Sequence, residues 1–308
     1  MADGRDEVRQ KSRTSNKYAA KKQATERIAA QRAAHQRAER RRNILIAGAS
    51  TLAVLIVVGV IVGIGLSQKK KTSADSTPVP ASDTVTSALS DAATSTLAST
   101  PDLSAVGNPP SLISGGAALT SPGGLPQVLY VGAEYCPNCA ATRWPLALAL
   151  ARFGTFSDLS TMYSSEDNLP TLSFHGSSYT SQYLDFDGKE QVDGENKPLE
   201  TLTAAESQLF ETLGIGPGGS SPGYPFIDFG GKWRQNGTVF DPTVISGMTP
   251  ESVAKAMTDS DSKVGKSIKA SADVYTAIIC ELDGGKPANV CTAPGVTTAE
   301  TAINGAGK

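Results

Sequence analysis

The stretch that decides the fold is Gln127-Val-Leu-Tyr-Val-Gly-Ala-Glu-Tyr-Cys-Pro-Asn-Cys139, which runs on into Ala140-Ala-Thr-Arg-Trp-Pro-Leu-Ala-Leu-Ala-Leu-Ala-Arg-Phe153. Residues 127–133 are a short apolar run of the kind found in buried central strands. Residues 140–153 are rich in Ala and Leu, which favour helix, and we expect Pro145 to kink that helix. The stretch therefore predicts a strand, a two-cysteine turn and a helix.

Downstream segments extend this unit into a mixed α/β domain. Two strand-like runs joined by Gly230 and Gly231 indicate a hairpin. Thr249 and Pro250 are typical of a helix start, as N-cap and first helical residue. The further elements that we expect are strands at 171–174, 179–186 and 226–229, a helix at 199–213 capped by Thr201 or Thr203, and a helix at about 264–282.

Cys136 and Cys139 carry the chemistry that the sequence indicates. Two residues separate them, so they can close a small disulfide ring. The N-terminus of the following helix favours thiolate over thiol and so lowers the pKa of the first cysteine. We therefore expect Cys136 to be the nucleophile and Cys139 to be the more buried cysteine that resolves a mixed disulfide. Such a pair needs no cofactor, and we expect none.

Two other interpretations of this pair stay open. It can be an inert disulfide, or it can be half of a zinc site completed by Cys280 and Cys291. Ten residues separate those two cysteines, rather than the two to four of zinc half-sites, so we expect no metal. They flank a turn-rich segment, and we expect a structural disulfide that contributes roughly 3 kcal/mol. The alternative is a second redox pair that relays electrons.

Glu134 is the candidate for proton transfer beside the cysteines. It lies two residues before Cys136 and can exchange a proton with a thiol, although a solvated loop carboxylate is the alternative. His175 is the only histidine after residue 42, and we expect it on the surface or in packing, which gives a Cys/His hydrolase little support. Trp144 and Trp233 are expected in the core or lining a groove.

Charge is distributed unevenly along the chain. Residues 1–42 hold 13 Lys and Arg against 5 Asp and Glu, a net charge of +8, whereas the remaining residues hold 15 against 25, a net charge of −10. Residues 44–66 are uncharged, and a helix of them, rising about 1.5 Å per residue, spans roughly 34 Å, enough to cross a bilayer. The longer basic run precedes this span, which predicts a cytoplasmic N-terminus. A cleaved signal peptide, the alternative, has shorter basic and apolar regions.

These patterns divide the chain into five parts. Residues 1–43 are a basic cytoplasmic tail that we expect to contact anionic lipid headgroups. Nucleic-acid binding is the alternative, but the tail lacks a base-reading motif, so we expect no nucleic-acid partner. Residues 44–66 are expected to be a transmembrane helix. Residues 67–108, rich in Ser, Thr, Ala and Pro, predict a disordered tether. Residues 109–295 are the expected extracytoplasmic domain, and residues 296–308 a flexible tail.

Five segments carry a resemblance to a known family. They are VGAEYCPNCAATRW at 131–144, LSFHG at 172–176, YPFIDFGGKW at 224–233, AIIC at 277–280 and GKPANVC at 285–291. Together they resemble a prokaryotic, membrane-anchored family known as domain of unknown function 929, over about Ala105 to Pro294. The resemblance implies a thioredoxin-like fold with insertions, following a single transmembrane helix, and it implies no particular substrate.

The resemblance also implies a substrate-binding position at Pro225. In thioredoxin-like proteins a cis-proline faces the cysteines and the backbone beside it pairs with a bound peptide, whereas an ordinary trans proline is the alternative. Tyr224 stands where Thr or Val is usual, which leaves the register of a bound peptide open. Pro170, before the strand-like run 171–174, is the rival position. Asn138 replaces the usual His or Tyr between the cysteines, so no redox potential is implied.

The sequence thus predicts a membrane-anchored, extracytoplasmic thiol:disulfide oxidoreductase. Its expected partners are cysteine-containing proteins outside the membrane, the lipid bilayer, and a membrane redox partner that resets Cys136 and Cys139. The compartment favours oxidation of clients, although the direction of electron flow stays open. The alternative is a non-enzymatic, thioredoxin-like accessory subunit of a membrane complex, in which the disulfides only stabilise the domain.

Overall fold

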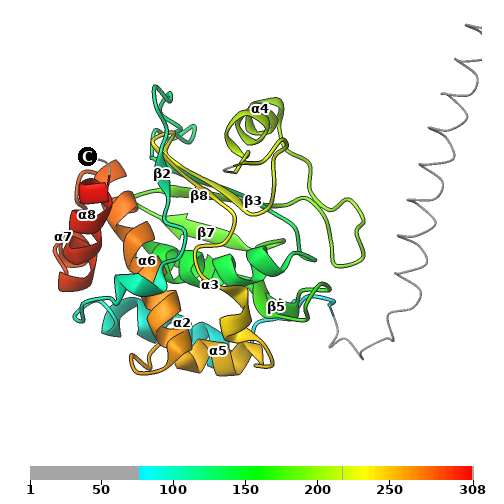
Figure 1. Ribbon diagram of the computed structural model, residues 1–308, viewed down its shortest axis with the longest axis horizontal. Coiled ribbons are helices and arrows are strands. Elements are labelled where there is room, and N and C mark those ends of the chain that lie inside the picture. The colour runs from blue at the N-terminus through cyan, green and yellow to red at the C-terminus, as the bar shows by residue number, and fades with distance from the viewer. Residues whose placement is uncertain (1–75, 217, 307–308) are drawn as a thin grey trace, which may run out of the picture. The chain divides into compact units, whose positions relative to one another are not determined.

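The computed structural model describes residues 76–216 and 218–306, which form a mixed α/β fold, as predicted (Figure 1). The helices are α2 (Asp83–Ser95), α3 (Pro137–Ala151), α4 (Ala204–Leu213), α5 (Pro250–Ala256), α6 (Lys263–Leu282), α7 (Ala288–Cys291) and α8 (Pro294–Ala306), with 3-10 turns η1 (Leu103–Ala105) and η2 (Pro242–Ile245). The strands are β1 (Val79–Pro80), β2 (Ser111–Leu112), β3 (Gln127–Gly132), β4 (Gly154–Ser157), β5 (Ser160–Tyr163), β6 (Pro170–Ser173), β7 (Ser178–Ser181), β8 (Asp185–Glu190), β9 (Phe226–Phe229) and β10 (Trp233–Asn236).

The central sheet has five strands in the order β2-β10-β9-β3-β8. Strand β3 runs parallel to β8, with Gln127 opposite Asp185 and Gly132 opposite Glu190, and antiparallel to β9. Parallel neighbours need a long crossover connection, and α3 with the segment after it supplies one here. Because β3 and β8 end at the same edge, the residues that follow β3 lie close to Glu190.

The two faces of β3 explain its apolar sequence. Successive side chains of a strand point to opposite faces. Val128 and Tyr130 belong to the larger core, which includes α3 and α6, whereas Leu129 and Val131 pack in a second cluster beneath α4. Figure 1 shows α4 on one side of the sheet and α3 on the other. The strand is therefore buried on both faces, as the apolar run predicted.

Helix α3 lies in the interior. Its N-cap is Cys136 and its first residue is Pro137, a position that suits proline because the first N–H groups of a helix have no partner within the helix. Every residue from Cys139 to Leu150 is buried, because the sheet, α2, α6 and β6 surround the helix. The helix continues through Pro145 to Ala151.

Strands β4 to β7, which lie between α3 and β8, form two small sheets: β4-β7, and β1-β5-β6 with the N-terminal strand β1. The single strand expected at 179–186 is wrong: β7 pairs with β4, whereas β8 pairs with β3. The Ser181 side chain explains the break, because its Oγ accepts hydrogen bonds from the backbone N–H groups of Tyr183, at 3.0 Å, and Leu184, at 3.4 Å. A side chain that binds nearby N–H groups in this way competes with continued strand pairing.

Most of the predicted helix starts and turns are confirmed. Strands β9 and β10 form the hairpin, with Gly230 and Gly231 both at positive φ, and α5 begins at Pro250 with Thr249 as its cap. Helix α4 begins at Ala204, five residues later than expected. Thr203 and Glu206 form a capping box there, which fixes the start of the helix.

The predicted disordered tether is wrong for residues 76–108. Strand β1 pairs with β5, and α2 packs against α3 and α5. The buried side chains of α2 are Val85, Leu89, Ala92 and Ala93, which recur at helical spacing and so form an apolar stripe. The small size of Ala disguised this stripe in a segment that is otherwise rich in Ser, Thr and Asp. Residues 67–75 of the predicted tether lie outside the described residues.

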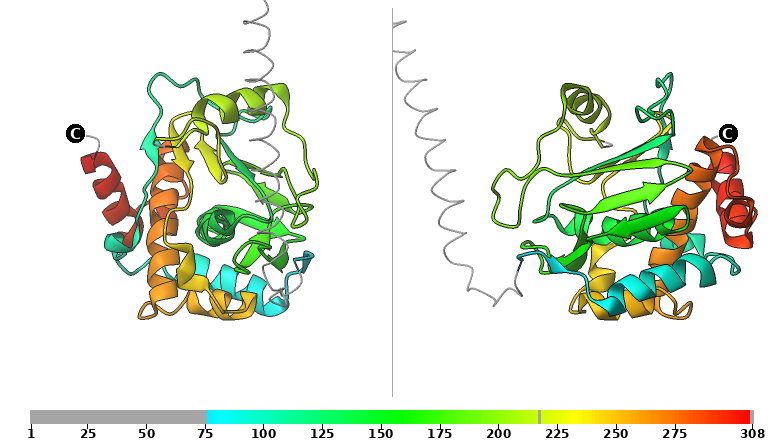
Figure 2. Two further views of the ribbon diagram at one scale, coloured as in Figure 1. Left: turned by 45° about the vertical axis from the view of Figure 1, so that its right-hand side comes forward. Right: turned by 180° about the vertical axis from the view of Figure 1, so that it is seen from behind.

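The predicted flexible tail after residue 295 is also wrong. Helix α8 begins at Pro294 and packs along α6, and both views of Figure 2 show the two helices side by side. Val296, Ala299 and Ile303 are buried, at spacings of three and four residues. The C-terminal segment therefore completes the core instead of trailing from it.

A buried ion cluster joins α2, α3 and α6. Asp273 on α6 forms an ion pair with the Arg152 Nη2 atom at 2.8 Å, and it accepts a hydrogen bond from the Lys269 Nζ atom. Arg152 also donates to Thr96 Oγ1 at 3.0 Å, and Lys269 donates to the Ser99 carbonyl at 2.8 Å, both in the segment at and after the end of α2. Two cations share one carboxylate here. The C-terminal ends of α2 and α3, which carry partial negative charge, supply further compensation.

The predicted transmembrane helix at 44–66 and the basic tail at 1–43 lie outside the described residues. Within residues 76–216 and 218–306, no helix combines the length and the apolar character that a membrane crossing requires.

Candidate functional site

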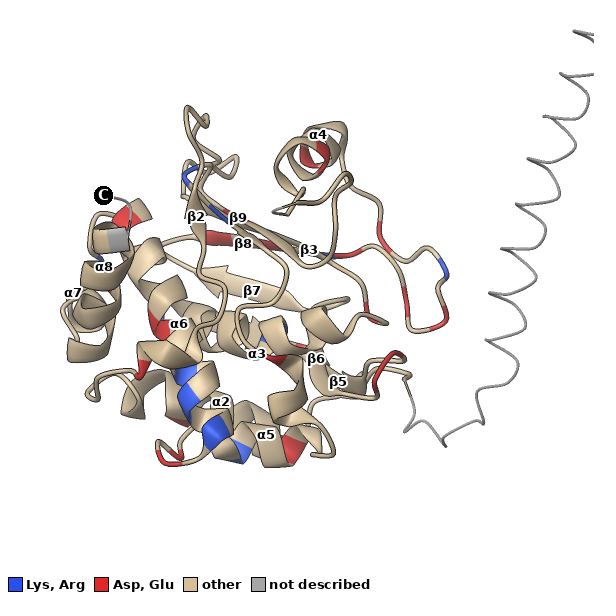
Figure 3. Cartoon of the chain, in the orientation of Figure 1, with Lys and Arg blue, Asp and Glu red and all other residues tan. Residues whose placement is uncertain are grey.

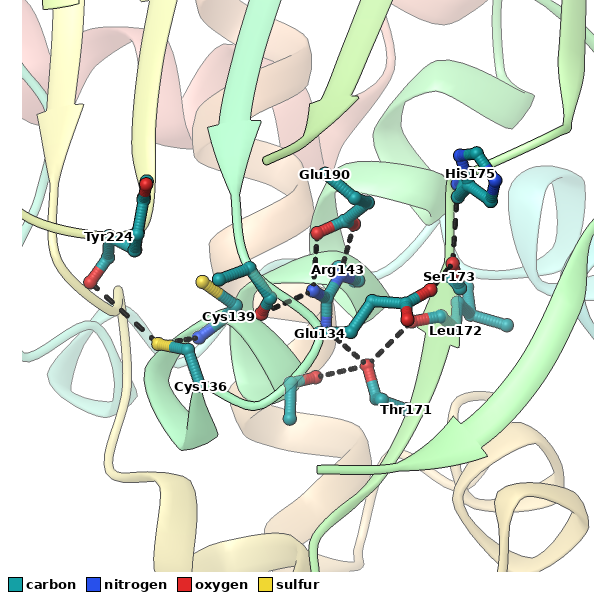
Figure 4. A network of polar contacts seen from close by, with 12 residues as sticks. Glu134, Cys136, Cys139, Arg143, Thr171, Leu172, Ser173, His175, Glu190 and Tyr224 are labelled. Carbon is teal, nitrogen blue, oxygen red and sulfur yellow. Dashed lines mark hydrogen bonds and ion pairs between the residues drawn. The ribbon is translucent and has the colours of Figure 1, made fainter. Parts of the chain in front are cut away.

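The two cysteines lie where the sequence placed them, at the end of β3 and the start of α3 (Figure 4). Both are free thiols; Cys136 is 6 % exposed and Cys139 is fully buried. The Cys136 Sγ atom accepts a hydrogen bond from the Cys139 backbone N–H at 3.3 Å, in the position of a helix cap. The Cys136 thiol also donates to the Tyr224 carbonyl at 3.9 Å. Cys136 is thus the outer thiol and Cys139 the inner one.

The surroundings of the two thiols drive their pKa values apart. Hydrogen bonds from the Cys139 thiol and backbone N–H lower the pKa of Cys136 below its ordinary value of 9.0, against the opposing effect of burial, and the charge of Arg143 adds to the lowering. Burial raises the pKa of Cys139 well above that value. An outer thiol that ionises easily and an inner one that resists ionisation match the roles of nucleophile and resolving cysteine.

Tyr224 lies against Cys136, and the peptide bond between Tyr224 and Pro225 is cis. The Tyr224 ring stacks on Phe210 of α4, with 5.5 Å between ring centres, and its hydroxyl donates to Gln191 Oε1 at 2.8 Å. These contacts hold the Tyr224 backbone beside the sulfur. The rival Pro170 instead opens strand β6, and its carbonyl accepts from the Trp144 indole at 3.0 Å.

A buried ion pair lies one helical turn behind Cys139. The Arg143 Nε and Nη2 atoms donate to the two carboxylate oxygens of Glu190, both at 2.7 Å, and neither side chain is exposed. Arg143 Nη2 also donates to the Ala133 carbonyl at 2.8 Å. Paired, bidentate contacts of this kind fix geometry strongly. They fasten α3 to the ends of β3 and β8 and so hold the cysteines in place.

Glu134 is buried, so its interpretation as a solvated loop carboxylate is wrong. It is only 1 % exposed, and its Oε1 atom accepts from Ser173 Oγ at 2.7 Å (Figure 4). Burial raises its pKa, and the hydrogen bond from Ser173 partly opposes that effect. A half-exposed His175 pairs with Glu200 at 3.5 Å and lies on the surface, as expected. Glu134 therefore remains a candidate for proton transfer.

The segment between β8 and α4, residues 191–203, forms a rim beside the cysteines, and this rim is acidic. Val192 of this segment packs against Cys136 and Cys139, and its carbonyl accepts from the Glu134 backbone N–H at 2.8 Å. The segment carries three carboxylates, Asp193, Glu195 and Glu200, against one ammonium, Lys197 (Figure 3). A molecule that approaches Cys136 along this rim meets net negative charge.

Cys280 and Cys291 form a disulfide, with their Cα atoms 5.6 Å apart. It joins the end of α6 to α7. Within the described part of the chain, no group of three or more His, Cys, Asp or Glu side chains is arranged to hold a metal ion. The zinc alternative for the four cysteines is therefore wrong, because two of them are bonded to each other.

Sequence reasoning missed Arg143, Glu190 and Ser173. Arg143 offered one signal, because it is the only charged residue in the apolar run 137–151 and follows Cys139 by one turn. A charge at such a position must find a buried partner. Nothing near it in the sequence identifies Glu190, which lies 47 residues further on.

Fold and site together define a mixed α/β protein that presents a free dithiol at the N-terminus of a buried helix. The chain belongs to the family described as Domain of unknown function (DUF929), whose model matches residues 116–215 and 221–281. Neither the curated proteins nor the solved structures contain a significant match to it.

Proposed function

We propose that the protein is a membrane-anchored, extracytoplasmic thiol:disulfide oxidoreductase that acts on protein cysteines. The observation that carries the proposal is the dithiol itself: Cys136 caps a helix and has a lowered pKa, and Cys139 lies behind it. An inert disulfide would not need an outer thiol that ionises easily. It also would not need the Cys139 thiol and backbone N–H as donors that stabilise the Cys136 thiolate.

The order of the elements supports a thioredoxin-like fold with insertions. In thioredoxin-like proteins, two parallel strands lie beside an antiparallel hairpin, the cysteines follow the first strand, and a proline precedes the hairpin. Here β3 and β8 are the parallel strands, β9 and β10 the hairpin, and Pro225 the proline. Strands β4 to β7 are then the insertion.

The reaction exchanges two electrons between sulfur pairs. A client thiolate attacks the Cys136 sulfur of the Cys136–Cys139 disulfide, and Cys139 leaves with the bonding electrons and takes up a proton. A second client thiolate then displaces Cys136, so that the client gains a disulfide and the protein is left with two thiols. The same steps in reverse reduce a client. A stabilised Cys136 thiolate favours the dithiol form, which makes the pair an electron acceptor.

The anchor and the partners belong to the same proposal. Residues 44–66 would hold the domain at the outer face of the cell membrane, with the N-terminus in the cytoplasm. A membrane redox partner would reoxidise Cys136 and Cys139 after each cycle. Cysteine-containing proteins outside the membrane would be the clients.

The pH dependence of alkylation tests the dithiol directly. Only the thiolate reacts, so a lowered pKa shifts the rise of the Cys136 alkylation rate to lower pH than for an ordinary thiol, and a raised pKa leaves Cys139 unreactive there. We expect iodoacetamide to label Cys136 of the reduced full-length protein at neutral pH, with Cys139 protected, as read by mass spectrometry. Equal, slow labelling of both thiols at neutral pH would contradict the proposal.

The second cysteine pair provides a separate test. Replacing both Cys280 and Cys291 by serine should lower the free energy of unfolding by roughly 3 kcal/mol, because the closed loop is lost from the unfolded chain. We expect thiol–disulfide exchange by the folded variant to match that of the parent protein. Urea unfolding and insulin reduction measure the two effects, and a loss of turnover would instead indicate an electron relay.

The alternative function is a non-enzymatic accessory subunit of a membrane complex. The nearly complete burial of Cys136 favours it, because a client must reach that sulfur. Stoichiometric co-purification with a membrane complex, together with no ionisation of Cys136 near neutral pH, would support this alternative over the oxidoreductase.

A further inference from the structure

The hydroxyl group of Tyr130 is an unexplained polar group in the core. Tyr130 is fully buried, and among the residues that the structure describes its hydroxyl makes no hydrogen bond of ordinary geometry; the side chain within its reach is that of Cys139. An unsatisfied buried polar group costs about 1–3 kcal/mol, and a phenylalanine would fill the same space without that cost. The Tyr130 hydroxyl therefore keeps a proton that it can donate to a group that becomes charged during the reaction.

Its position places this hydroxyl beside the cysteines. A Cβ atom on Gly132 would lie 2.1 Å from the Tyr130 oxygen, so the hydroxyl occupies the space that a side chain at 132 would need. The next residue, Ala133, packs against Cys136 and Cys139. The Arg143 guanidinium lies over the Tyr130 ring, 5.9 Å from its centre. Burial raises the pKa of Tyr130 well above its ordinary value, and the neighbouring Cys139 contributes to the rise.

Cys139 is the group that lacks stabilisation during the reaction. It must exist as a thiolate when it attacks a mixed disulfide on Cys136, and it leaves as a thiolate in the opposite direction. The backbone N–H of Cys139 donates to the Cys136 sulfur and not to the Cys139 sulfur. The charge of Arg143 is already neutralised by Glu190. A buried anion without donors is costly, so a fixed donor near Cys139 would lower the barrier.

We propose that the Tyr130 hydroxyl donates a hydrogen bond to the Cys139 thiolate that forms during resolution, and that Gly132 is glycine to leave room for it. This inference rests on the proposed oxidoreductase function. The Cys139 thiol first loses its proton to solvent, and the thiolate accepts the Tyr130 O–H, which keeps its own proton. The Cys139 sulfur then bonds to Cys136 while the client sulfur leaves with the electron pair and is protonated.

The test follows resolution with a chromogenic disulfide, dithionitrobenzoate, added below one equivalent to the reduced full-length protein in detergent. Attack by Cys136 releases one thionitrobenzoate, and attack by Cys139 on the resulting mixed disulfide releases a second. In Tyr130→Phe we expect the rate of the first phase to stay within about twofold of the rate in the parent protein. The second should slow about 3- to 10-fold, and its pH midpoint should rise by about one to two units, as for a lost hydrogen bond to a charged group.

Tyr275→Phe is the matched control. Tyr275 is also fully buried with an unpaired hydroxyl, but it packs on Phe229, and burial alone raises its pKa. Both variants remove a buried unpaired hydroxyl, so neither should lower the melting temperature of the dithiol form. Only Tyr130→Phe should alter the second phase, and a purely structural role would not move its pH midpoint.

A second variant reverses the sign of the effect. The analogue 3-fluorotyrosine in place of Tyr130 is a stronger donor of nearly the same size, so it should lower the pH midpoint of the second phase. An unchanged midpoint in both variants, or an equal slowing in Tyr275→Phe, overturns the inference while leaving the proposed function intact. If the parent protein releases no thionitrobenzoate in the first phase, the proposed function and the inference fail together.

Discussion

Replacing Cys136 by serine is expected to reduce thiol–disulfide exchange by the full-length protein to the uncatalysed level. The hydroxyl of serine does not ionise near neutral pH and cannot form a disulfide, so no mixed disulfide with a client is possible. Cys139 cannot take over, because it is fully buried and its pKa is raised. Insulin reduction and the refolding of reduced ribonuclease measure the loss in the two directions.

Cys139→Ser is the matched comparison for this experiment. It keeps the outer nucleophile and removes only the resolving thiol, so it should accumulate a mixed disulfide with clients on Cys136. Non-reducing electrophoresis would detect these adducts. Full exchange activity in Cys136→Ser would show that the dithiol is not the catalyst.

Replacing Asp273 by asparagine should give the largest loss of stability. Asp273 is fully buried, and among the described residues it is the carboxylate that pairs with both Arg152 and Lys269, which are also buried. Removing one partner of a buried ion pair costs about 3–5 kcal/mol, since it leaves charge without compensation, and here two cations would lose their common partner. Urea unfolding of the purified protein should show this decrease in the free energy of unfolding.

Asp261→Asn provides the control for charge alone. Asp261 is an exposed carboxylate just before the same helix, α6, and its loss should change the free energy of unfolding by less than about 0.5 kcal/mol. If Asp273→Asn were as stable as this control, the cluster would not join α2, α3 and α6 energetically.

The parts of the fold that could be predicted have signals within a few residues. The apolar run before Cys136, the two glycines of the β9–β10 hairpin and the Thr249-Pro250 pair each specify local geometry, and each element formed where expected. The nucleophile and its neighbouring thiol were predicted for the same reason, because the end of a strand and the start of a helix are adjacent in the sequence.

The parts that could not be predicted depend on contacts between distant residues. Segment 76–108 is polar in composition, and its helix is stable only because Val85 and Leu89 bury against α3 and α5. The burial of Glu134 likewise depends on Ser173, 39 residues away, and the position of Arg143 depends on Glu190. No local pattern contains these partners, so composition alone made the first segment a tether and Glu134 a surface residue.

Helices α2 and α8 lie outside the region that defines the family, residues 116–281, yet both contribute buried side chains to the same core. A recombinant fragment trimmed to the family limits would leave the apolar surfaces of α3, α5 and α6 open to water. Such a fragment should aggregate or be degraded, and its inactivity would say nothing about the dithiol. Biochemical work on this family should therefore set its fragment boundaries by the packed helices rather than by the extent of sequence similarity.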